Sequence, residues 1–357
     1  MQEIKHRDFS IEEQQQYSRH LILDEIGTEG QLKLKNASVL VIGAGGLGCP
    51  VLQLIAAAGV GTIGMIDDDK VEQSNLQRQL LYTHQDLGKY KVAVAAKRLR
   101  GLNPYIQFET FTERLVPENA VALFAKYDII VDGSDNFPTR YLVNDAAILA
   151  GKPLVFAAIF KFEGQVSVFN YKNGPTYRCL FPTPPEAHTM PSCSEIGVFS
   201  VLPGLIGALQ ANEVLKIICG IGTVLSGKLL TLNALTLEQY LFKFKKNQAH
   251  TVTALENNYG TFCGLLSDGI EISLAELKAT KNSYLLLDVR TQEERDEFHI
   301  GGIHIPLDVL EQRFGEIDTD KEIVVYCKSG LRSKKAIHLL QGLGLDKMLI
   351  NLKGGCF

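Results

Sequence analysis

Short apolar runs alternate with longer helix-like stretches along the chain up to residue 160. Each run has the length and the turn-forming flanks of a buried strand, and each longer stretch has the length of a helix. Strands that alternate with helices form a mostly parallel sheet covered on both faces. The pattern therefore predicts an α/β domain. We expect strands at 39–42, 62–66, 106–111, 128–132 and 154–158, and helices that end near residue 58 and span 91–102 and 140–150.

The pattern changes after this point, where apolar runs at 165–169 and 228–232 are typical of antiparallel strands. The sheet is therefore expected to be mixed. A proline-rich segment at 183–194 predicts an exposed loop, and 204–218 predicts a long apolar helix. Residues 243–264 are polar and irregular, which is typical of a linker.

A second alternating unit begins near Ile270. Strands are expected at 284–289 and 322–326, with a helix at 333–343, so a smaller α/β domain follows the first. The predicted domains are 1–245 and 267–357, joined by a linker at 246–266.

Composition narrows the class of protein. The 357 residues are 46% hydrophobic and 21% charged, with a net charge of -4, which is typical of a globular chain long enough for two or three domains. Without a basic excess, no nucleic-acid partner is expected. The N-terminus lacks the apolar core of a signal peptide, and no apolar run reaches the ~18 residues of a membrane span, so we expect a cytoplasmic protein. Seven cysteines are too dilute for a disulfide scaffold.

A glycine-rich turn follows the first predicted strand. Gly43, Gly45 and Gly48 fit the dinucleotide fingerprint, in which backbone amides approach phosphate at a helix N-terminus. Asp67 ends the next strand, where an acid binds ribose hydroxyls. These residues alone do not separate an ATP enzyme from a dehydrogenase or a flavoprotein, and a tight structural turn also needs glycines.

The segment after this acid carries unusual positive charge. Arg78, Lys89 and Lys91 lie in one short stretch, which a triphosphate with its metal needs and a nicotinamide cofactor does not. Asp135 follows another strand and is placed to hold that metal. A solvated surface is the alternative interpretation of the cations. Together, these residues favour ATP and Mg²⁺ over NAD.

Several motifs now give a specific resemblance. The turn at 43–48, the segment Ser74-Asn-Leu-Gln-Arg-Gln79, Lys91 and the segment Asp132-Gly-Ser-Asp-Asn136 occur in this order. Over residues 10–245 they resemble the ubiquitin-activating superfamily, and most closely its bacterial MoeB and ThiF types. The resemblance implies a Rossmann-like ATP-binding domain that adenylates the Gly-Gly end of a small ubiquitin-like sulfur carrier, chiefly by positioning and charge neutralisation.

The resemblance also implies roles for individual residues. Arg19 resembles an arginine that reaches the triphosphate of the other subunit, which implies a homodimer. Asp135 is the expected Mg²⁺ ligand, and Arg78 is expected to take part in catalysis beside it. The expected nucleotide-binding residues are Gly43, Gly45, Gly48, Asp67, Asp69, Asn75, Arg78, Gln79 and Lys91.

A second reactive site is predicted near the C-terminus. Cys327 ends an apolar strand and opens a six-residue loop to Arg332, and a helix follows. Loop amides, the helix N-terminus, Lys328 and Arg332 are expected to stabilise a thiolate or a persulfide. A buried structural cysteine is the alternative, and a phosphatase loop needs one more residue. The loop and the segment 286–290 resemble a single-domain rhodanese over about 270–357. Rhodaneses usually continue past this point to a tryptophan and a short helix. The domain is therefore expected to be cut short at its C-terminal end.

The remaining cysteines raise two questions. Cys193, in the proline-rich loop, resembles the cysteine that attacks the adenylate or resolves a mixed intermediate in fused members, and a nonessential thiol is the alternative. The family usually binds zinc through two Cys-x-x-Cys pairs. Here Cys179 and Cys263 are remnants of those pairs, because Thr176 and Gly260 stand at the first positions. Two thiolates cannot close a structural zinc site, so no zinc is expected.

These observations predict one function. ATP activates the tail of a MoaD-like sulfur carrier, and a persulfide on Cys327 then supplies the sulfur that leaves a thiocarboxylate, in molybdopterin synthesis. A ThiS-like carrier of thiamine synthesis is the second choice, and the sulfur donor is expected to be a persulfide or thiosulfate. A NAD-dependent oxidoreductase and a non-catalytic scaffold are the alternatives from other classes.

Overall fold

The computed structural model describes residues 9–185, 197–263, 270–280, 283–317, 319–345 and 347–356. They form two compact units, one built mainly from residues up to Tyr259 and the other mainly from Gly260 onward.

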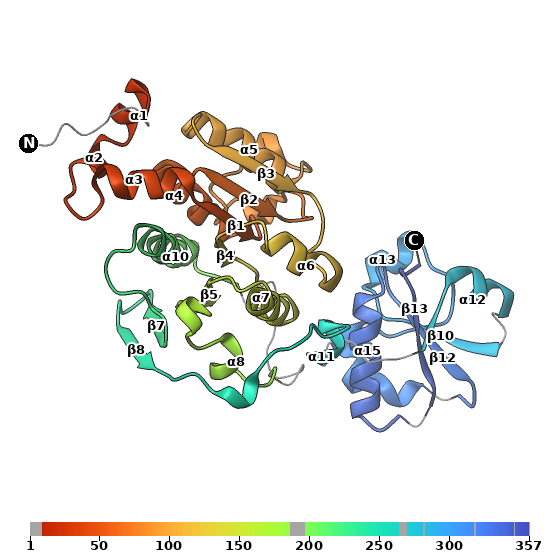
Figure 1. The fold of residues 1–357 in the computed structure, drawn as a ribbon. Coiled ribbons are helices and arrows are strands. Elements are labelled where there is room, and N and C mark those ends of the chain that lie inside the picture. The colour runs from red at the N-terminus through yellow and green to blue at the C-terminus, as the bar shows by residue number, and fades with distance from the viewer. Residues whose placement is uncertain are drawn as a thin grey trace, which may run out of the picture. The chain divides into compact units, whose positions relative to one another are not determined.

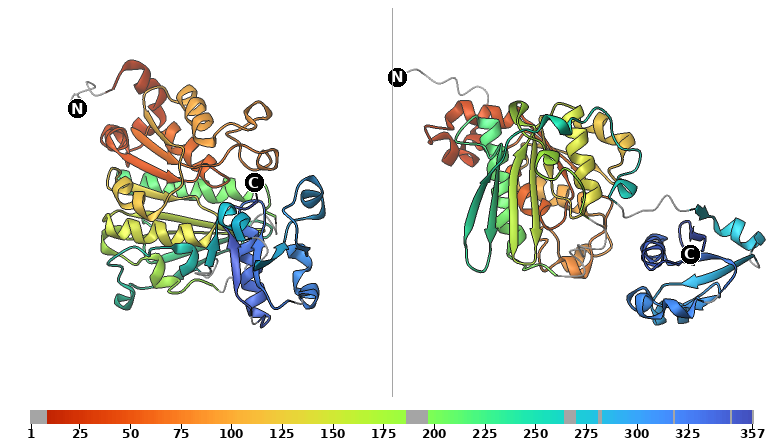
Figure 2. Two further views of the ribbon diagram at one scale, coloured as in Figure 1. Left: turned by 90° about the vertical axis from the view of Figure 1, so that its right-hand side faces the viewer. Right: turned by 90° about the horizontal axis from the view of Figure 1, so that it is seen from below.

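The first unit is built around one eight-stranded sheet in the order β3-β2-β1-β4-β5-β6-β7-β8. The strands from β3 to β5 are parallel. Parallel sheets are covered on both faces, which explains why a run such as Val39–Ile42 is apolar and buried throughout. The strands from β5 to β8 are antiparallel and lie side by side in the right-hand view of Figure 2. The predicted α/β class with a mixed sheet is confirmed. The strands are β1 Ser38–Ile42, β2 Thr62–Ile66, β3 Gln107–Phe111, β4 Ile129–Asp132, β5 Leu154–Phe160, β6 Glu163–Phe169, β7 Lys228–Asn233 and β8 Gln239–Lys243.

Helices cover both faces of the parallel part of this sheet. Figure 1 shows α4 and α10 on one face and α6 and α7 on the other. This arrangement leaves the carboxyl ends of the central strands uncovered. The helices are α1 Ile11–Gln16, α2 Ser18–Leu21, α3 Gly27–Asn36, α4 Gly48–Ala58, α5 Lys91–Leu102, α6 Pro117–Phe124, α7 Phe137–Leu149, α8 Tyr177–Leu180 and α10 Leu202–Cys219. The short helix α11 Tyr259–Phe262 begins at the last residue of the first unit and continues into the second.

One helix in the described part of the chain, α10, has the length and hydropathy to cross a bilayer. It packs against α4, β5 and β6, and half of it is buried within the protein. The apolar sequence is therefore accounted for by the core of the first unit.

The second unit holds a five-stranded sheet in the order β11-β10-β12-β13-β9, with all pairs parallel. Apolar clusters lie on both faces of this sheet, one containing Val325 and Cys327 and the other Val324 and Tyr326. The elements are β9 Ile270–Ile272, α12 Leu274–Thr280, β10 Tyr284–Asp288, α13 Gln292–Glu297, β11 Ile303–His304, α14 Leu310–Arg313, β12 Glu322–Tyr326, α15 Leu331–Gly342 and β13 Leu349–Leu352.

The first part of the predicted linker 246–266 is attached to the first unit. Lys246 donates to Asn173, and the amide of Asn247 donates to the sulfur of Cys179 at 3.3 Å. Tyr259 donates its hydroxyl to Asp145 at 2.7 Å. The chain is thus held to the first unit as far as Tyr259.

Candidate functional site

A cavity of about 320 Å³ opens at the carboxyl ends of β1, β2 and β4, beside the point where the strand order reverses. Ligands of doubly wound sheets bind at this point because loops of neighbouring strands diverge there. Most of the residues predicted to bind nucleotide share the cavity wall. They are Gly43, Gly45, Asp67, Asp69, Arg78, Gln79, Lys91 and Asp135.

The glycine turn is shaped by two positions that exclude a side chain. Gly43 has a φ of +88°, which an L residue rarely adopts. A Cβ at Gly48 would clash with the carbonyl oxygen of Gly43. Gly48 is absent from the cavity wall, so its role is to let the turn close onto the start of α4.

Asp67, the predicted ribose ligand, also organises the turn. One carboxylate oxygen accepts the amide of Ala44 at 2.7 Å, and the other accepts the amide of Asp69 at 2.8 Å. Burial raises the pKa of Asp67, although the charge of Lys91 and these two amides oppose the shift. The carboxylate holds the turn in place, and its remaining lone pairs face the cavity.

Two of the predicted cations reach the cavity and one does not. Lys91 has a side chain only 6% exposed and makes an ion pair with Asp69 at 2.7 Å. Arg78 lines the cavity and donates to the carbonyl of Ser74 at 2.9 Å. Lys89 instead donates to the carbonyl of Gln85, outside the cavity wall.

The two predicted amide side chains have different positions. Asn75 is buried and accepts the amide of Glu72 at 3.2 Å, so it caps a short 3-10 turn and does not line the cavity. Gln79 lines the cavity, and its buried Oε1 has no hydrogen-bond partner among the described residues. A buried acceptor without a partner is costly, so a donor that a ligand brings to this oxygen would be bound favourably.

The predicted metal ligand lies on the loop after β4. Asp135 is exposed in the cavity wall, and one of its oxygens accepts the side chain of Asn136 at 3.3 Å. A carboxylate oxygen open to the cavity suits Mg²⁺, which keeps most of its water and binds few protein ligands. The neighbouring Asp132 is buried, which raises its pKa, and it accepts Ser134 rather than facing the cavity.

Arg140, which was not among the residues predicted from the sequence, also lines the cavity. It lies in the first turns of α7, five positions after Asp135, and is 9% exposed. Asn136 caps α7 by accepting the amide of Thr139, so this helix starts at the cavity. The position of Arg140 early in this helix was the signal available in the sequence.

Of the two remaining predicted residues, only Arg19 belongs to the described part of the chain. Arg19 is exposed on α2 and does not line the cavity, so its predicted role concerns a second subunit. Cys193 lies outside the described residues.

The remnant of the first cysteine pair is hydrogen bonded. Burial raises the pKa of Cys179, but the amide of Asn247 and the hydroxyl of Thr176 outweigh this effect and lower the pKa overall. Cys263 is buried and belongs to the second unit. No cluster of cysteines that could hold a metal occurs within the ranges that the structure describes. The absence of zinc stays a prediction.

The second unit holds the predicted sulfur site. Cys327 follows β12 with no exposed surface, and its Sγ accepts the amides of Gly330 at 3.2 Å and Ser333 at 3.4 Å. The φ of +84° at Gly330 turns its amide toward the sulfur. The hydroxyl of Ser333 lies 3.5 Å from Sγ. Amides at a helix N-terminus stabilise negative charge, so this cradle suits a thiolate or a persulfide.

An ion pair between Arg332 and Glu294, which was not predicted from the sequence, holds the end of this loop. Both oxygens of Glu294 contact Arg332, at 2.5 and 2.6 Å. The hydrogen bonds from Arg332 lower the pKa of Glu294 to about 2. Arg332 is thus paired, and its charge is not wholly available to a ligand of Cys327.

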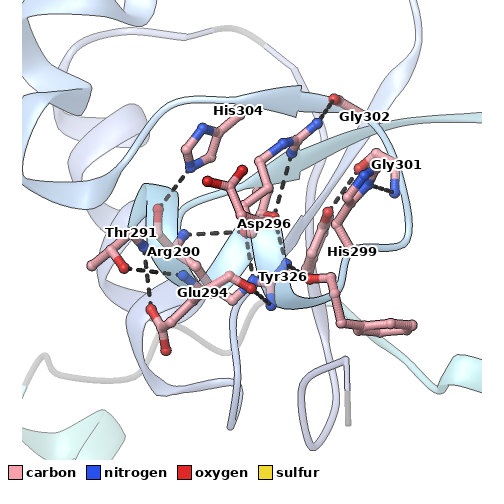
Figure 3. Close-up of polar contacts among 12 residues, drawn as sticks. Arg290, Thr291, Glu294, Asp296, His299, Gly301, Gly302, His304 and Tyr326 are labelled. Atoms are coloured by element: carbon pink, nitrogen blue, oxygen red, sulfur yellow. Dashed lines mark hydrogen bonds and ion pairs between the residues drawn. The ribbon is translucent and has the colours of Figure 1, made fainter.

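Buried polar contacts fix the segment that carries Glu294. Arg290 makes a fully buried ion pair with Asp288 at 2.7 Å and donates to the carbonyls of Glu294 and Phe298. Figure 3 shows this arginine beside Thr291, whose amide donates to Glu294, and beside Tyr326, whose hydroxyl donates to Gly301. The segment 290–304 is therefore rigid where it meets the sulfur loop.

A glycine-turn cavity with buried cations and a thiol cradle after a strand define an adenylating enzyme of the ubiquitin-activating type joined to a rhodanese. The chain belongs to the ThiF family, whose model matches residues 17–254, and a rhodanese-like domain model matches residues 273–357. It is an enzyme of the adenylyltransferase and sulfurtransferase class, and its family uses ATP and acts on a small ubiquitin-like protein.

Curated relatives extend over most of the chain. "Adenylyltransferase and sulfurtransferase MOCS3" of Xenopus laevis is 43% identical, covering 95% of this chain and 84% of the relative. "Probable adenylyltransferase/sulfurtransferase MoeZ" of Mycobacterium tuberculosis is 42% identical, covering 97% and 92%. "Sulfur carrier protein adenylyltransferase" of Thermus thermophilus is 51% identical over 71% of this chain and 98% of the relative.

Solved structures share the fold of the first unit. A crystal structure of E. coli MccB with MccA-N7isoASN has a TM-score of 0.60 at 24% identity, covering 69% of this chain and 75% of that one. A crystal structure of PaaA has a TM-score of 0.58 at 23% identity, covering 69% and 78%. At this identity the likeness concerns the fold alone.

Proposed function

We propose that this enzyme uses Mg²⁺ and ATP to adenylate the C-terminal Gly-Gly carboxylate of a small ubiquitin-like sulfur carrier, and then delivers sulfur from Cys327 to give a thiocarboxylate. The observation that carries the proposal is the occurrence of both sites in one chain. A triphosphate cavity with Arg78 and Lys91 activates an acyl group, and an amide-lined thiol supplies a sulfur nucleophile.

In the first step, a carboxylate oxygen attacks the α-phosphorus of ATP. A new phosphorus–oxygen bond forms as the bond to the β-phosphate bridging oxygen breaks, and pyrophosphate leaves with the electron pair. Arg78 and Lys91 neutralise the triphosphate, and Asp135 binds the Mg²⁺ that accompanies it. The protein contributes mainly orientation and charge balance.

In the second step, the thiolate of Cys327 attacks the outer sulfur of a donor persulfide, and the donor leaves as a thiolate. The resulting persulfide attacks the acyl carbonyl, AMP leaves, and an acyl disulfide joins the carrier to Cys327. A second thiol, for which we propose Cys193, attacks the sulfur of Cys327 and releases the thiocarboxylate. A cellular dithiol then reduces the disulfide between the two cysteines. Thiosulfate, which leaves as sulfite, is the alternative donor.

The carrier needs a surface on which to dock. Large apolar side chains are exposed on the edge strand β8 and on the turn before it. The strands β7 and β6 connect this edge to β5, which lines the cavity through Ile159. We propose that the carrier covers this edge and passes its tail to the cavity. The exposed residues are Leu235, Leu237, Tyr240, Leu241 and Phe242.

We propose molybdopterin synthesis as the pathway, and thiamine synthesis as the second candidate. A relative named "Probable molybdopterin-synthase adenylyltransferase", from Porphyra purpurea, is 41% identical over 97% of this chain and 93% of its own length, which supports the first pathway. We also propose a homodimer, because Arg19 is exposed in the described structure and its expected ligand is the triphosphate of the other subunit.

One experiment tests the function directly. The enzyme is mixed with ATP, Mg²⁺, a sulfur donor and candidate carriers that end in Gly-Gly, and the carriers are weighed by mass spectrometry. Replacement of one oxygen by sulfur in one carrier identifies both reaction and partner. Unchanged masses together with a flat ATP–pyrophosphate exchange for every carrier would remove the proposal. Tight binding of NADH without binding of ATP would favour an oxidoreductase instead.

A further inference from the structure

Arg140 is held in an unusual environment for a charged side chain. It is 9% exposed, and its guanidinium lies over the rings of Phe137 and Phe156, 5.4 and 5.7 Å from their centroids. The two rings restrict the side chain and shield it from water, which strengthens its interaction with an anion. At the same time Arg140 lines the cavity, so its guanidinium borders the space that a ligand would fill.

The donor capacity of this arginine is not used within the described structure. Its buried Nε has no hydrogen-bond partner. The buried Asp132 is its electrostatic neighbour, but Asp132 accepts Ser134 with Oδ1, and its Oδ2 also has no partner. The two groups therefore do not close a hydrogen-bonded ion pair. A buried donor without a partner is costly, so a ligand whose acceptor reaches Nε, with a small adjustment of the side chain, would remove that cost.

The sheet places Arg140 at the other side of the cavity from the cations assigned to phosphate. Arg78 and Lys91 come from segments that follow β2. Arg140 is backed by Phe156 of β5, and the strand order β2-β1-β4-β5 separates β5 from β2 by two strands. The strand β8, proposed to bind the carrier, lies on the β5 side of the sheet, beyond β6 and β7. A tail that arrives from that side would meet Arg140 before it reaches the phosphates.

We propose that Arg140 binds the C-terminal carboxylate of the protein substrate and presents one of its oxygens to the α-phosphorus of ATP. The inference rests on the proposed function and names the residue that recognises the acyl substrate. Nε and a terminal nitrogen of a guanidinium form two parallel hydrogen bonds with a carboxylate, which fixes its plane. The positive charge also offsets the repulsion between the carboxylate and the triphosphate.

The test measures recognition of the carboxylate itself. One carrier is prepared in two forms, one with its natural C-terminal carboxylate and one ending in a carboxamide. Binding of each form to the full-length enzyme, with Mg²⁺ and a non-hydrolysable ATP analogue, is measured by calorimetry. The wild-type enzyme is expected to prefer the carboxylate by about tenfold or more, as for other hydrogen bonds to a charged group.

Two variants and a matched control assign this preference. Arg140→Lys keeps the charge beside Asp132 but loses the fork, and Arg140→Gln removes both, so each should reduce the preference to within about twofold of unity. Arg114→Gln removes an exposed arginine from the same cavity wall and should leave the preference unchanged, whatever its effect on nucleotide affinity.

The outcomes separate this inference from the function on which it rests. A wild-type enzyme that catalyses ATP–pyrophosphate exchange but binds both carrier forms equally overturns the role of Arg140 alone, and it does so without any variant. The inference also fails if both Arg140 variants weaken binding of the nucleotide analogue while the carboxylate preference persists. A wild-type enzyme without exchange or carrier binding removes the proposed function as well.

Discussion

Tyr259 donates its hydroxyl to Asp145 at 2.7 Å and thereby joins the last residues of the first unit to a helix 114 positions earlier. Arg178 donates to both oxygens of the same carboxylate, at 2.8 and 2.7 Å. Tyr259 and Asp145 are buried. Arg178 is the neighbour of Cys179 in the sequence, so these contacts attach the chain up to Tyr259 close to that cysteine.

Tyr259→Phe should loosen this attachment. The substitution keeps the buried ring but removes one hydrogen bond to a buried carboxylate, at a cost of about 1 kcal/mol. We expect a lower midpoint of urea unfolding and faster proteolysis of residues 246–259, with ATP–pyrophosphate exchange retained. Tyr240→Phe, on the exposed strand β8, is the control and should change neither measurement. Equal protease sensitivity of the two variants would show that Tyr259 does not hold the segment.

Asp135→Ala should stop adenylation. Loss of the oxygen ligand leaves the metal of the triphosphate without its protein contact, and we expect a decrease of about 100-fold or more in ATP–pyrophosphate exchange. Persulfide formation on Cys327 should continue. The control is Asp320→Ala, which alters a fully exposed carboxylate in the second unit and should leave exchange intact. Exchange at the wild-type rate in a folded Asp135 variant would show that the metal is held elsewhere.

Cys327→Ala should stop sulfur transfer and leave ATP–pyrophosphate exchange intact. The cradle amides would lose their sulfur, so no persulfide forms and no thiocarboxylate appears on the carrier, whereas exchange proceeds. Cys356→Ala is the control, because Cys356 is buried with Tyr326 in the cluster on the other face of the sheet. Carrier mass and exchange are measured on the same preparations. If the Cys327 variant loses exchange while it remains folded, the two sites are not independent.

The sequence predicted seven strands of the first unit, from the fully covered β1 to the largely exposed β3, but it missed β8 in that unit and β9, β11 and β13 in the second. The run Val39–Ile42 is apolar throughout because both faces of β1 are covered, and its length marks it as a strand. β8 is exposed along its whole length, from Gln239 to Lys243, and shows no alternation that would identify one covered face. Its pairing with β7 depends on backbone hydrogen bonds, which leave no mark on the sequence.

The site shows a similar division. Gly43, Asp67 and Lys91 belong to motifs with fixed spacing, and the fold brings all three to one cavity. Arg140 belongs to no motif of fixed spacing, and its position early in a helix is a weak signal, because an arginine there looks like a surface residue until the rings around it are seen. The partner of Arg332 was equally inaccessible, since Glu294 lies 38 positions away and the contact depends on how two loops meet.

Glu294→Gln should destabilise the second unit in a pH-dependent way. The folded-state pKa of Glu294 is about 2, below its ordinary value of 4.5, because Arg332 binds its charged form. The ion pair therefore stabilises the fold at pH values above 4.5, and this contribution is lost as the pH falls toward 2.

The side chain of Glu294 is partly exposed, so we expect a wild-type advantage of about 1 kcal/mol at pH 7. The urea midpoint of the second unit, followed by hydrogen–deuterium exchange of peptides from residues 270–356, should show this advantage at pH 7 and its progressive loss at pH 4 and pH 3. Glu297→Gln, an exposed change on the same helix, should give the same difference from wild type at every pH. An advantage that stays constant down to pH 3 would contradict the assignment of the pair.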